Sequence, residues 1–299
     1  MPAATGAELS VFEIEFSAMG TRCSLSLFAA TQEVARTMAE PVIADVTRLE
    51  AKYSRYKKDS FLSAINRVAE QGGSIEVDSE TAALLDYAHA CYEESDGLFD
   101  ITSGLLRRAW NFQPEGQTQL PDAGALAQLL TRVGWENIQW KQPRLSFPRQ
   151  GMELDFGGVV KEYAVDRACG LLQASGAHHA LVNLGGDVGV SGAKPDGSAW
   201  HVAISDPEQP DSPLLTVELS SGALASSGSY ARALEINGQT YSHLLNPKTG
   251  YPFTGLQAAS VVADQCTVAG SLATIALLKQ EHGRNFLEQT GLWFFLKGV

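Results

Sequence analysis

The segment Asp155-Phe156-Gly157-Gly158-Val159-Val160-Lys161 predicts a strand, a glycine turn and a helix in direct succession. The apolar residues before the glycines predict a short strand over 152–156, and the pattern after them predicts a helix over 159–174. Glycine lacks a Cβ atom, so the backbone at the turn can approach a ligand closely. The free amides of the helix start and the ammonium group of Lys161 favour an anion such as phosphate. A structural turn with a solvated lysine explains the segment about as well in isolation.

Three further segments pair glycine or a tight turn with polar chemistry: Asn183-Leu184-Gly185-Gly186-Asp187, Ser226-Ser227-Gly228-Ser229-Tyr230, and His243-Leu244-Leu245-Asn246-Pro247-Lys248-Thr249-Gly250. Taken alone, each is more often an ordinary turn. Four such segments in one chain indicate an enzyme that binds a phosphate-bearing ligand together with its metal.

The hydrophobic pattern further out predicts a mixture of strands and helices. Alternation over 11–28 predicts two strands joined by a tight turn, and helical spacing predicts a helix over 31–53. A second helix over 79–95 has Ser79 as its expected N-cap, and the last helix is expected over 266–279. The hairpins imply antiparallel pairing. We therefore predict an α+β fold of largely antiparallel sheets packed with helices, forming a single catalytic domain over 1–299 with one or two lobes.

Shorter elements complete the prediction. Residues 111–122 are rich in Gln, Pro and Gly and are expected to form an exposed excursion. A short helix is expected over 122–134, a hairpin over 137–147, and strands over 180–184, 188–191, 200–205, 214–219 and 293–296.

The composition excludes several classes of protein. The chain has 299 residues, of which 44% are hydrophobic and 19% charged, as is usual for a globular protein, and its net charge is −12. Such an acidic surface repels nucleic acid. The four cysteines have no zinc-like spacing and suit a reducing compartment. Without a visible leader or transmembrane segment, we expect a cytoplasmic protein, or a periplasmic one if a leader was removed.

Two smaller groups of residues are candidates for ligand contact. His243 can act as a base because an imidazole titrates near neutral pH, although a lone histidine is more often structural. Phe99, Asp100 and Thr102 offer an aromatic face and two oxygen groups, which a capping turn at a helix end explains equally well. Tyr56 can stack on a base or line the core.

In this order along the chain, the motifs resemble the FAD:protein FMN transferase family, also called ApbE. The resemblance extends over nearly the whole chain: Met19-Gly20-Thr21, Tyr53-Ser54-Arg55-Tyr56 with Asn66, Gly97 to Thr102, Asp155 to Asp166, Ala180 to Asp187, Ser227 to Tyr230 with Arg232, His243 to Pro252, and Ala269 to Ala276. It implies an enzyme that uses Mg²⁺ and FAD, and that attaches FMN to a threonine of an acceptor protein with release of AMP.

The resemblance also implies roles for individual residues. The positions that match the FAD contacts of the family are Met19, Tyr56, Leu98, Phe99, Asp100, Thr102, Asp155, Lys161 and Leu244. The backbone carbonyl of Gly158 and the side chain of Thr274 match the Mg²⁺ ligands. His243 matches the base that activates the acceptor threonine.

The sequence departs from the family pattern at two positions. Gly270 stands four residues before Thr274, where the family usually carries an aspartate on the same helix face. Mg²⁺ prefers hard oxygen ligands, so this loss weakens the predicted metal site unless another group compensates, and Asp264 and Asp187 are the candidates. Glu162 follows Lys161 where many members have glycine, which adds a negative charge near the expected phosphate.

Three hypotheses follow for the activity. The first is a Mg²⁺-dependent transferase that moves FMN from FAD to an acceptor protein. The second is an FAD pyrophosphatase that gives FMN and AMP. The third is a protein that binds FAD without turnover because its metal site is weakened. The partners expected are FAD and the acceptor protein, with no nucleic acid.

Overall fold

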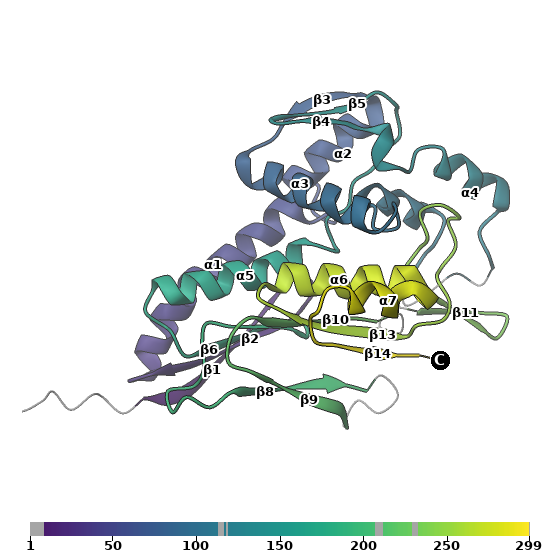
Figure 1. Ribbon diagram of the computed structural model, residues 1–299. Coiled ribbons are helices and arrows are strands. Elements are labelled where there is room, and N and C mark those ends of the chain that lie inside the picture. Colours follow the sequence, from purple (N-terminus) through teal and green to yellow (C-terminus); the bar gives the residue numbers. More distant parts are fainter. Residues whose placement is uncertain (1–8, 113–116, 118, 207–211, 229–232, 299) are drawn as a thin grey trace, which may run out of the picture. The chain divides into compact units, whose positions relative to one another are not determined.

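The computed structural model describes residues 9–112, 117, 119–206, 212–228 and 233–298. These residues form two compact units (Figure 1). Unit 1 comprises Met1–Glu50, Lys161–Ala225 and Val262–Ala269, and unit 2 comprises Ala51–Val160, Ser226–Val261 and Gly270–Val299. The motif residues Ser229, Tyr230 and Arg232 lie outside the described part of the chain.

Unit 1 is built on antiparallel strands. Strands β1 (Ser10–Ala18), β2 (Thr21–Ala29), β6 (Ala180–Leu184), β7 (Asp187–Val190) and the start of β10 (Ala223–Gly228) pair in that order. Strands β8 (Trp200–Ser205) and β9 (Pro213–Leu219) form a separate antiparallel pair. The helices of this unit are α5 (Val160–Ala174), most of α1 (Gln32–Tyr53) and the start of α6 (Cys266–Lys279).

Strand β7 carries different partners on its two faces because successive side chains of a strand point to opposite sides. Val188 and Val190 pack with Trp200 and other residues of β8 and β9 in one hydrophobic cluster. Gly189, between them, faces α5, where an added Cβ would lie 2.7 Å from a methyl group of Val165. The sheet of unit 1 therefore has the β8–β9 pair on one face and α5 on the other.

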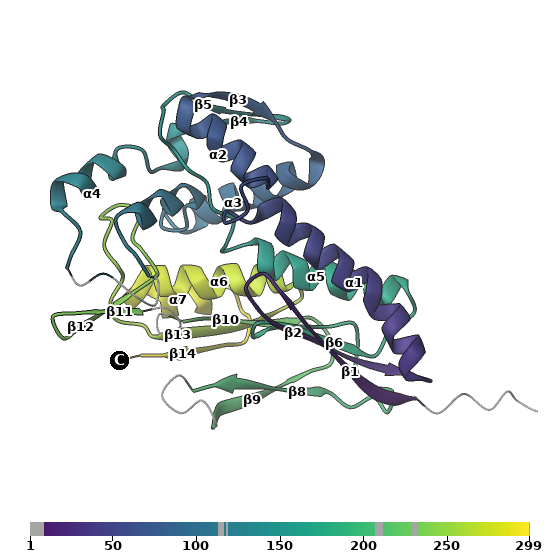
Figure 2. The ribbon, with the colours of Figure 1, turned by 180° about the vertical axis from the view of Figure 1, so that it is seen from behind.

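Unit 2 holds the remaining elements. Its helical segments are α2 (Phe61–Gln71), α3 (Ser79–Glu94), η1 (Ile101–Arg108), α4 (Ala123–Leu130), η2 (Trp135–Asn137), most of α6, η3 (Gln280–His282) and α7 (Gly283–Glu288). A small sheet pairs β3 (Gly73–Glu76), β5 (Arg144–Phe147) and β4 (Gln139–Lys141), and Figure 2 shows it beside α2. Two antiparallel strand pairs complete the unit: β11 (Ala233–Ile236) with β12 (Gln239–Ser242), and β13 (Ala258–Ala263) with β14 (Phe294–Lys297).

Trp110 is the centre of a hydrophobic core in unit 2. Its side chain is fully buried, and its indole Nε1 donates a hydrogen bond to the carbonyl of Gly250 at 2.8 Å. The cluster around it includes Leu105 and Leu106 of η1, Leu126 of α4 and Leu245. Burial of these side chains holds η1, α4 and the loop that follows β12 together.

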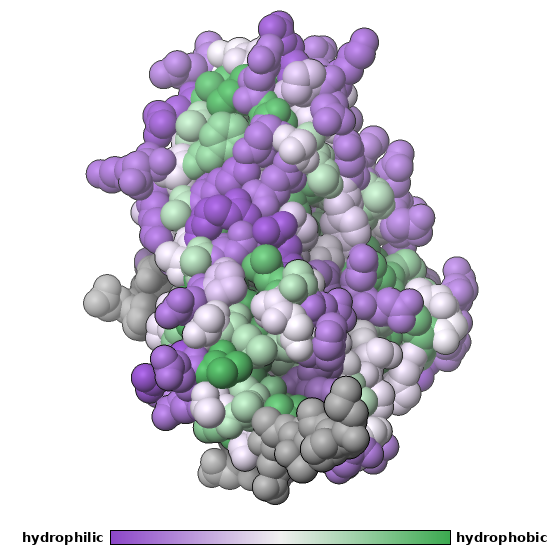
Figure 3. Space-filling model, turned by 90° about the vertical axis from the view of Figure 1, so that its left-hand side faces the viewer, coloured by the Kyte–Doolittle hydropathy of each residue, from purple (hydrophilic) through white to green (hydrophobic). Residues whose placement is uncertain are grey.

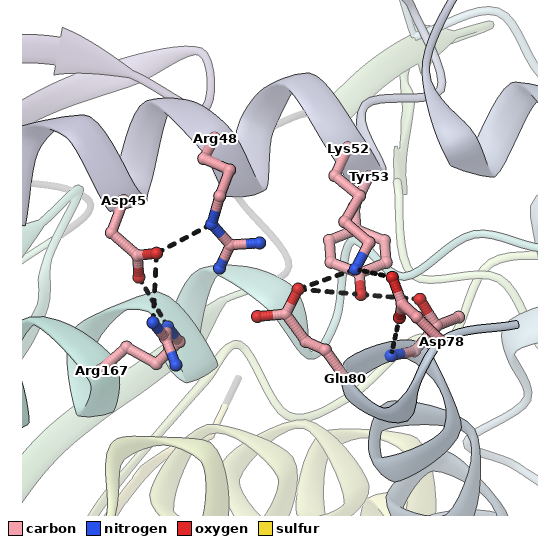
Figure 4. A network of polar contacts seen from close by, with 8 residues as sticks. Asp45, Arg48, Lys52, Tyr53, Asp78, Glu80 and Arg167 are labelled. Carbon is pink, nitrogen blue, oxygen red and sulfur yellow. Dashed lines mark hydrogen bonds and ion pairs between the residues drawn. The ribbon is translucent and has the colours of Figure 1, made fainter.

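Charged residues on α1 tie it to neighbouring helices within each unit (Figure 4). In unit 1, Arg167 of α5 donates to both oxygens of Asp45, at 2.5 and 3.1 Å. Burial opposes ionisation of Asp45, but the hydrogen bonds from arginine dominate and lower its pKa. In unit 2, Lys52 Nζ lies 2.5 Å from Asp78 and 2.8 Å from Glu80, at the start of α3.

The predicted fold class, α+β with largely antiparallel sheets, is confirmed. The helix predicted over 266–279 has the observed bounds, and the helix over 31–53 begins at Gln32. Strands are found close to each predicted range except one. The assignment of residues 1–299 to a single domain stays a prediction.

The strand expected over 152–156 is wrong, because its backbone groups bond elsewhere. The amide of Asp155 donates to the carbonyl of Ile101 at 2.8 Å, and the amide and carbonyl of Leu154 bond to the side-chain amide of Asn66. These partners satisfy the backbone without a neighbouring strand. The expected N-cap Ser79 is also wrong: Asp78 caps α3 by accepting from the amide of Thr81 at 2.8 Å.

The sequence did not predict α2, the strands β3, β10 and β13, or the β11–β12 pair. Helix α7 also follows the helix that was expected to be the last. On the face shown in Figure 3, small groups of hydrophobic residues are interspersed among hydrophilic ones, as is ordinary for a protein surface. None of the helices in the described ranges is long and apolar enough to cross a membrane.

Candidate functional site

The turn that leads into α5 is held by Asp155. Its Oδ1 accepts a hydrogen bond from the amide of Gly157 at 2.9 Å, and its Oδ2 lies 3.2 Å from Arg55 Nη1 and 2.8 Å from Arg107 Nη1. Two guanidinium groups against one carboxylate leave an excess positive charge beside the glycine turn. The adjacent Gly158 lies against the Phe99 ring, where an added Cβ would approach to 3.2 Å. This part of unit 2 suits an anionic ligand.

Tyr56 presents its ring at the surface of the same region. It is 67% exposed, and the guanidinium group of Arg55 lies 4.8 Å from the centre of its ring. Arg55 Nη2 also donates to the Tyr56 hydroxyl at 3.2 Å. The exposure excludes the core role that was one alternative for Tyr56, and the stacked arginine orients its ring.

Asp100 and Thr102 form a capping turn at the start of η1. Asp100 Oδ1 accepts from the amide and from the hydroxyl of Thr102, at 2.8 and 2.7 Å, and the Thr102 hydroxyl oxygen accepts from the amide of Gly134 at 2.7 Å. Both side chains are buried, and burial raises the pKa of Asp100 to about 6. Their side-chain oxygens thus serve the local fold, while Leu98 is half-buried and Phe99 is buried.

A cavity in unit 2 brings two of the sequence motifs together. Its volume is about 220 Å³, which is smaller than the usual pocket for a drug-sized ligand. Within it, the hydroxyl of Tyr92 donates to Glu136 at 2.7 Å. The lining residues are Tyr92, Gly97, Asp100, Leu130, Val133, Gly134, Glu136, Pro247 and Lys248. The segments 97–102 and 243–250 therefore meet here.

His243 precedes a loop that is closed by hydrogen bonds from its own backbone to the side chain of Asn246. It follows β12 and is half-buried, with its Nδ1 atom buried. After it, Asn246 Oδ1 accepts from the amides of Lys248 and Thr249, at 2.8 and 3.3 Å. Gly250 at the end of the loop has φ 74° and packs against Leu126, where an added Cβ would lie 2.7 Å from a methyl carbon. The half-buried Leu244 follows the imidazole in the chain, and the ordered loop positions both.

Thr274, the predicted metal ligand on α6, lies beside a residue of another predicted motif. Its Oγ1 is 2.7 Å from the hydroxyl oxygen of Ser227 on β10. A second hydroxyl pair, Ser226 with Ser260, has the same separation of 2.7 Å. The Ser226 segment and the last helix thus meet in unit 2, and two hard oxygen atoms lie together there.

In unit 1, Lys161 joins two of the glycine segments. Its ammonium group forms an ion pair with Asp187, which ends the Asn183 segment and is 1% exposed. Lys161 Nζ also lies 3.6 Å from Glu162 Oε1. The Asn183 segment had no assigned role in the sequence, and its carboxylate now has one as the partner of Lys161.

The turn between β1 and β2 packs on the same glycine segment. Met19 occupies the left-handed region, with φ 53°, and is half-buried. Gly185 has φ 65°, and an added Cβ there would lie 2.6 Å from the hydroxyl of Thr21. Only glycine satisfies both the backbone angle and this close approach. Unit 1 therefore gathers Met19, Lys161 and Asp187 around neighbouring turns.

Comparison with known proteins shows the family to which the chain belongs. The model of the ApbE family matches residues 19–295. This chain belongs to the ApbE family. The FAD:protein FMN transferase of Haemophilus influenzae is 28% identical over an alignment that covers 98% of this chain and 88% of the relative. The FAD:protein FMN transferase of Treponema pallidum is 29% identical, with 86% of this chain and 75% of the relative covered.

Solved ApbE structures share the fold. The ApbE protein of Thermotoga maritima is similar with a TM-score of 0.85 and 30% identity, over 97% of this chain and 94% of that one. The flavinyl transferase ApbE of Pseudomonas stutzeri, in its apo form, is similar with a TM-score of 0.85 and 26% identity, over 97% and 92% of the two chains.

The structure shows where Gly270, which departs from the ApbE pattern, and the two aspartates that could compensate for it lie. Gly270 is buried on α6. Two aspartates could replace the carboxylate that is missing at position 270: Asp264 is exposed, and Asp187 is paired with Lys161. Among the residues that the structure describes, no three His, Cys, Asp or Glu side chains gather as a metal site.

The sequence did not indicate Arg107 or the pairing of Ser227 with Thr274. Arg107 lies 48 residues before Asp155, and Ser227 lies 47 residues before Thr274. No local pattern marks either contact. The arginine could have been suspected only from the run of two arginines at the end of η1, which is a common surface feature.

Proposed function

We propose that this protein transfers FMN from FAD to a threonine hydroxyl of an acceptor protein, with release of AMP, and that Mg²⁺ is required. The observation that carries the proposal is the match to relatives named FAD:protein FMN transferase, over 98% of this chain for one relative and 86% for the other. The alternatives, FAD hydrolysis and FAD binding without turnover, lack a comparable observation.

The chemistry is a displacement at phosphorus. The acceptor hydroxyl attacks the phosphorus on the FMN side, its proton passes to a base, and the bond to the AMP oxygen breaks. His243 is the residue proposed to take the proton, and its ordered loop supports that role because a base must be held at a defined position.

Positive charge is needed where the pyrophosphate binds. The excess charge of Arg55 and Arg107 over Asp155, beside Gly157, supports binding of an anion in unit 2. Lys161 is the further FAD contact proposed in unit 1. Met19, Tyr56, Leu98, Phe99, Asp100, Thr102, Asp155 and Leu244 remain the proposed flavin-nucleotide contacts.

The proposed magnesium ligands are oxygen atoms, which suit this cation. The paired hydroxyls of Ser227 and Thr274 provide such oxygens in unit 2, and Gly158 contributes its carbonyl in the proposal. When bound, the ion would neutralise charge on the pyrophosphate.

The decisive experiment incubates the purified protein with FAD and an acceptor protein, with and without Mg²⁺. Transfer predicts flavin covalently attached to the acceptor and one AMP for each FMN attached. FMN and AMP formed equally without acceptor would indicate the pyrophosphatase. Bound FAD that stays intact would contradict both enzymatic hypotheses.

Replacement of the proposed base tests the mechanism. We expect His243→Asn to lower the transfer rate by roughly 10²- to 10⁴-fold while FAD affinity changes little, since general-base catalysis contributes about this much. Rates of acceptor labelling and the FAD dissociation constant measure the two effects. His201→Asn is the matched control, because His201 is an exposed histidine paired with Glu218 on β9. A variant at position 243 that labels the acceptor at the wild-type rate would exclude His243 as the base.

A further inference from the structure

Arg107, on η1, binds a carboxylate oxygen that also has a second arginine as its partner. Its Nη1 atom lies 2.8 Å from Asp155 Oδ2, and Arg55 Nη1 lies 3.2 Å from the same oxygen. The side chain of Asp155 is 13% exposed, so this carboxylate depends on protein donors rather than on water. Hydrogen bonds between charged groups are usually about 2.7–2.9 Å long, and only the contact with Arg107 has this length. Arg107 is therefore the closer of two cations that share one oxygen.

Asp155 itself is fixed in place by η1. Its amide donates to the carbonyl of Ile101 at 2.8 Å, and a Cβ added at Gly104 would lie 2.7 Å from the aspartate Cβ. Its other oxygen, Oδ1, accepts from the amide of Gly157 at 2.9 Å. Ile101, Gly104 and Arg107 all belong to η1. One short helix thus holds the main chain of Asp155 and also supplies the arginine that binds its Oδ2.

Arg55 divides its guanidinium group between Asp155 and Tyr56. Its Nη1 atom contacts Asp155, whereas its Nη2 atom donates to the Tyr56 hydroxyl at 3.2 Å. The centre of the guanidinium group lies 4.8 Å from the centre of the Tyr56 ring. Because a guanidinium group is planar and rigid, two contacts through different nitrogen atoms fix its orientation. Tyr56 is 67% exposed, so packing restricts its ring little and the orientation of Arg55 matters to it.

This division of Arg55 depends on Arg107. While Arg107 neutralises Asp155 Oδ2 at close range, Arg55 needs only one nitrogen atom for the carboxylate. Without Arg107, Asp155 would rely on Arg55. A guanidinium group that faces a carboxylate favours two parallel hydrogen bonds, which would engage the nitrogen atom that now contacts Tyr56. Loss of Arg107 should therefore draw Arg55 away from the Tyr56 ring.

We propose that Arg107 is a positioning residue for ligand binding: through Asp155 and Arg55, it holds the ring of Tyr56 ready to stack on a planar ring of the bound dinucleotide. The inference rests on the proposed contact of Tyr56 with FAD, and it gives Arg107 a role that requires no contact with the ligand. All four residues belong to unit 2. A ring that is already held in its binding orientation loses less conformational freedom on binding, which increases affinity.

Tyrosine ring resonances test the proposal in the ligand-free protein. With isotope-labelled tyrosine, and with the Tyr56 signals assigned through Tyr56→Phe, we expect Arg107→Met to shift the Tyr56 ring signals, because the cation beside the ring moves. Arg107→Gln removes the same charge and provides the test if Arg107→Met does not fold. Arg107→Lys keeps a cation for Asp155 and should retain much of the wild-type signal.

Arg108 offers a matched control on the same helix. It is the next residue of η1, and like Arg107 it is paired with acidic residues: its Nη2 atom lies 3.1 Å from both Glu70 and Glu153. Arg108→Met removes the same number of charges from η1 without touching Asp155. It should leave the Tyr56 signals and the affinity for FAD unchanged.

Affinity for FAD provides the second measurement. Arg107→Met should raise the FAD dissociation constant about two- to fivefold, which corresponds to the loss of one exposed cation–π contact. Quenching of flavin fluorescence measures this constant. In a Tyr56→Leu background the same substitution should have no further effect, because Arg107 acts through the ring that is missing there.

Two results would overturn the proposal. The first is a folded Arg107→Met or Arg107→Gln variant whose Tyr56 signals match those of the wild type. The second is a loss of FAD affinity that is equally large in the Tyr56→Leu background, because Arg107 would then act on the ligand without the ring. The ring signals are recorded without FAD or an acceptor, so failure of this positioning role is distinguishable from failure of the proposed flavin transfer.

Discussion

Asp155 and Glu162 stand on either side of the same glycine turn in the sequence, yet their carboxylates have opposite surroundings. Asp155 accepts from two arginines and from the amide of Gly157. Glu162 Oε1 lies 3.6 Å from Lys161, which is also paired with Asp187, and Glu162 Oε2 has no hydrogen-bond partner among the described residues. The first carboxylate has two cations to itself, and the second one shares a single cation with Asp187.

Neutralising each of the two carboxylates in turn should give the largest difference in the free energy of unfolding. We expect Asp155→Asn to lower the free energy of unfolding by roughly 2–3 kcal/mol, since it leaves two partly buried arginines without a counterion. Glu162→Gln should cause little loss, because Glu162 shares the single positive charge of Lys161 with Asp187, which is the closer partner. Urea denaturation measures both values. Equal destabilisation by the two variants would show that Glu162 is compensated in the metal-free protein.

A steric change can disturb Asp155 without altering its charge. Gly104 of η1 lies so close to Asp155 that an added Cβ would be 2.7 Å from the aspartate Cβ. We expect Gly104→Ala to cost about 1–3 kcal/mol through overpacking and to displace the carboxylate from its arginines. Gly170→Ala, in α5, is the control: nothing lies within 4 Å of its Cβ, so it should gain roughly 0.5–1 kcal/mol from helix propensity. A neutral Gly104→Ala variant would mean that η1 shifts freely away from Asp155.

Asp100 is another acidic residue, and because it is buried its charge should make stability depend on pH. Burial raises its pKa in the folded protein to about 6, from 3.8. Protonated Asp100 suits the fold, so its contribution is fully present below pH 3.8 and is lost as the pH rises through 6. Between pH 5 and pH 8 this should lower the free energy of unfolding by about 1.4 kcal/mol.

The variant Asp100→Asn isolates this contribution, because it cannot ionise and its oxygen can still accept from Thr102. Stability of the wild type and the variant should be measured by urea denaturation at both pH values. The difference in stability between the two proteins should change by the stated amount between pH 5 and pH 8. A constant difference would contradict the raised pKa.

Most helices and strands could be predicted from the sequence because their hydrophobic period is local. The helix over 266–279 and the two strands on either side of Gly20 illustrate this. The strand over 152–156 could not be excluded in the same way. The backbone amides of this segment donate hydrogen bonds to Ile101 and Asn66, which lie far away in the chain. No local sequence pattern indicates such partners.

For the candidate functional site, too, some features could be predicted from the sequence and others could not. The sequence by itself determined the four glycine segments, the family resemblance and the two unusual residues, Glu162 and Gly270, because residue identity and spacing are local properties. Only the tertiary structure decided which charges meet: Asp155 with two arginines, Lys161 with Asp187, and Glu162 with the same lysine at 3.6 Å. The physical reason is that electrostatic energy depends on distance and burial in space, and both are set by packing between residues that the chain holds far apart.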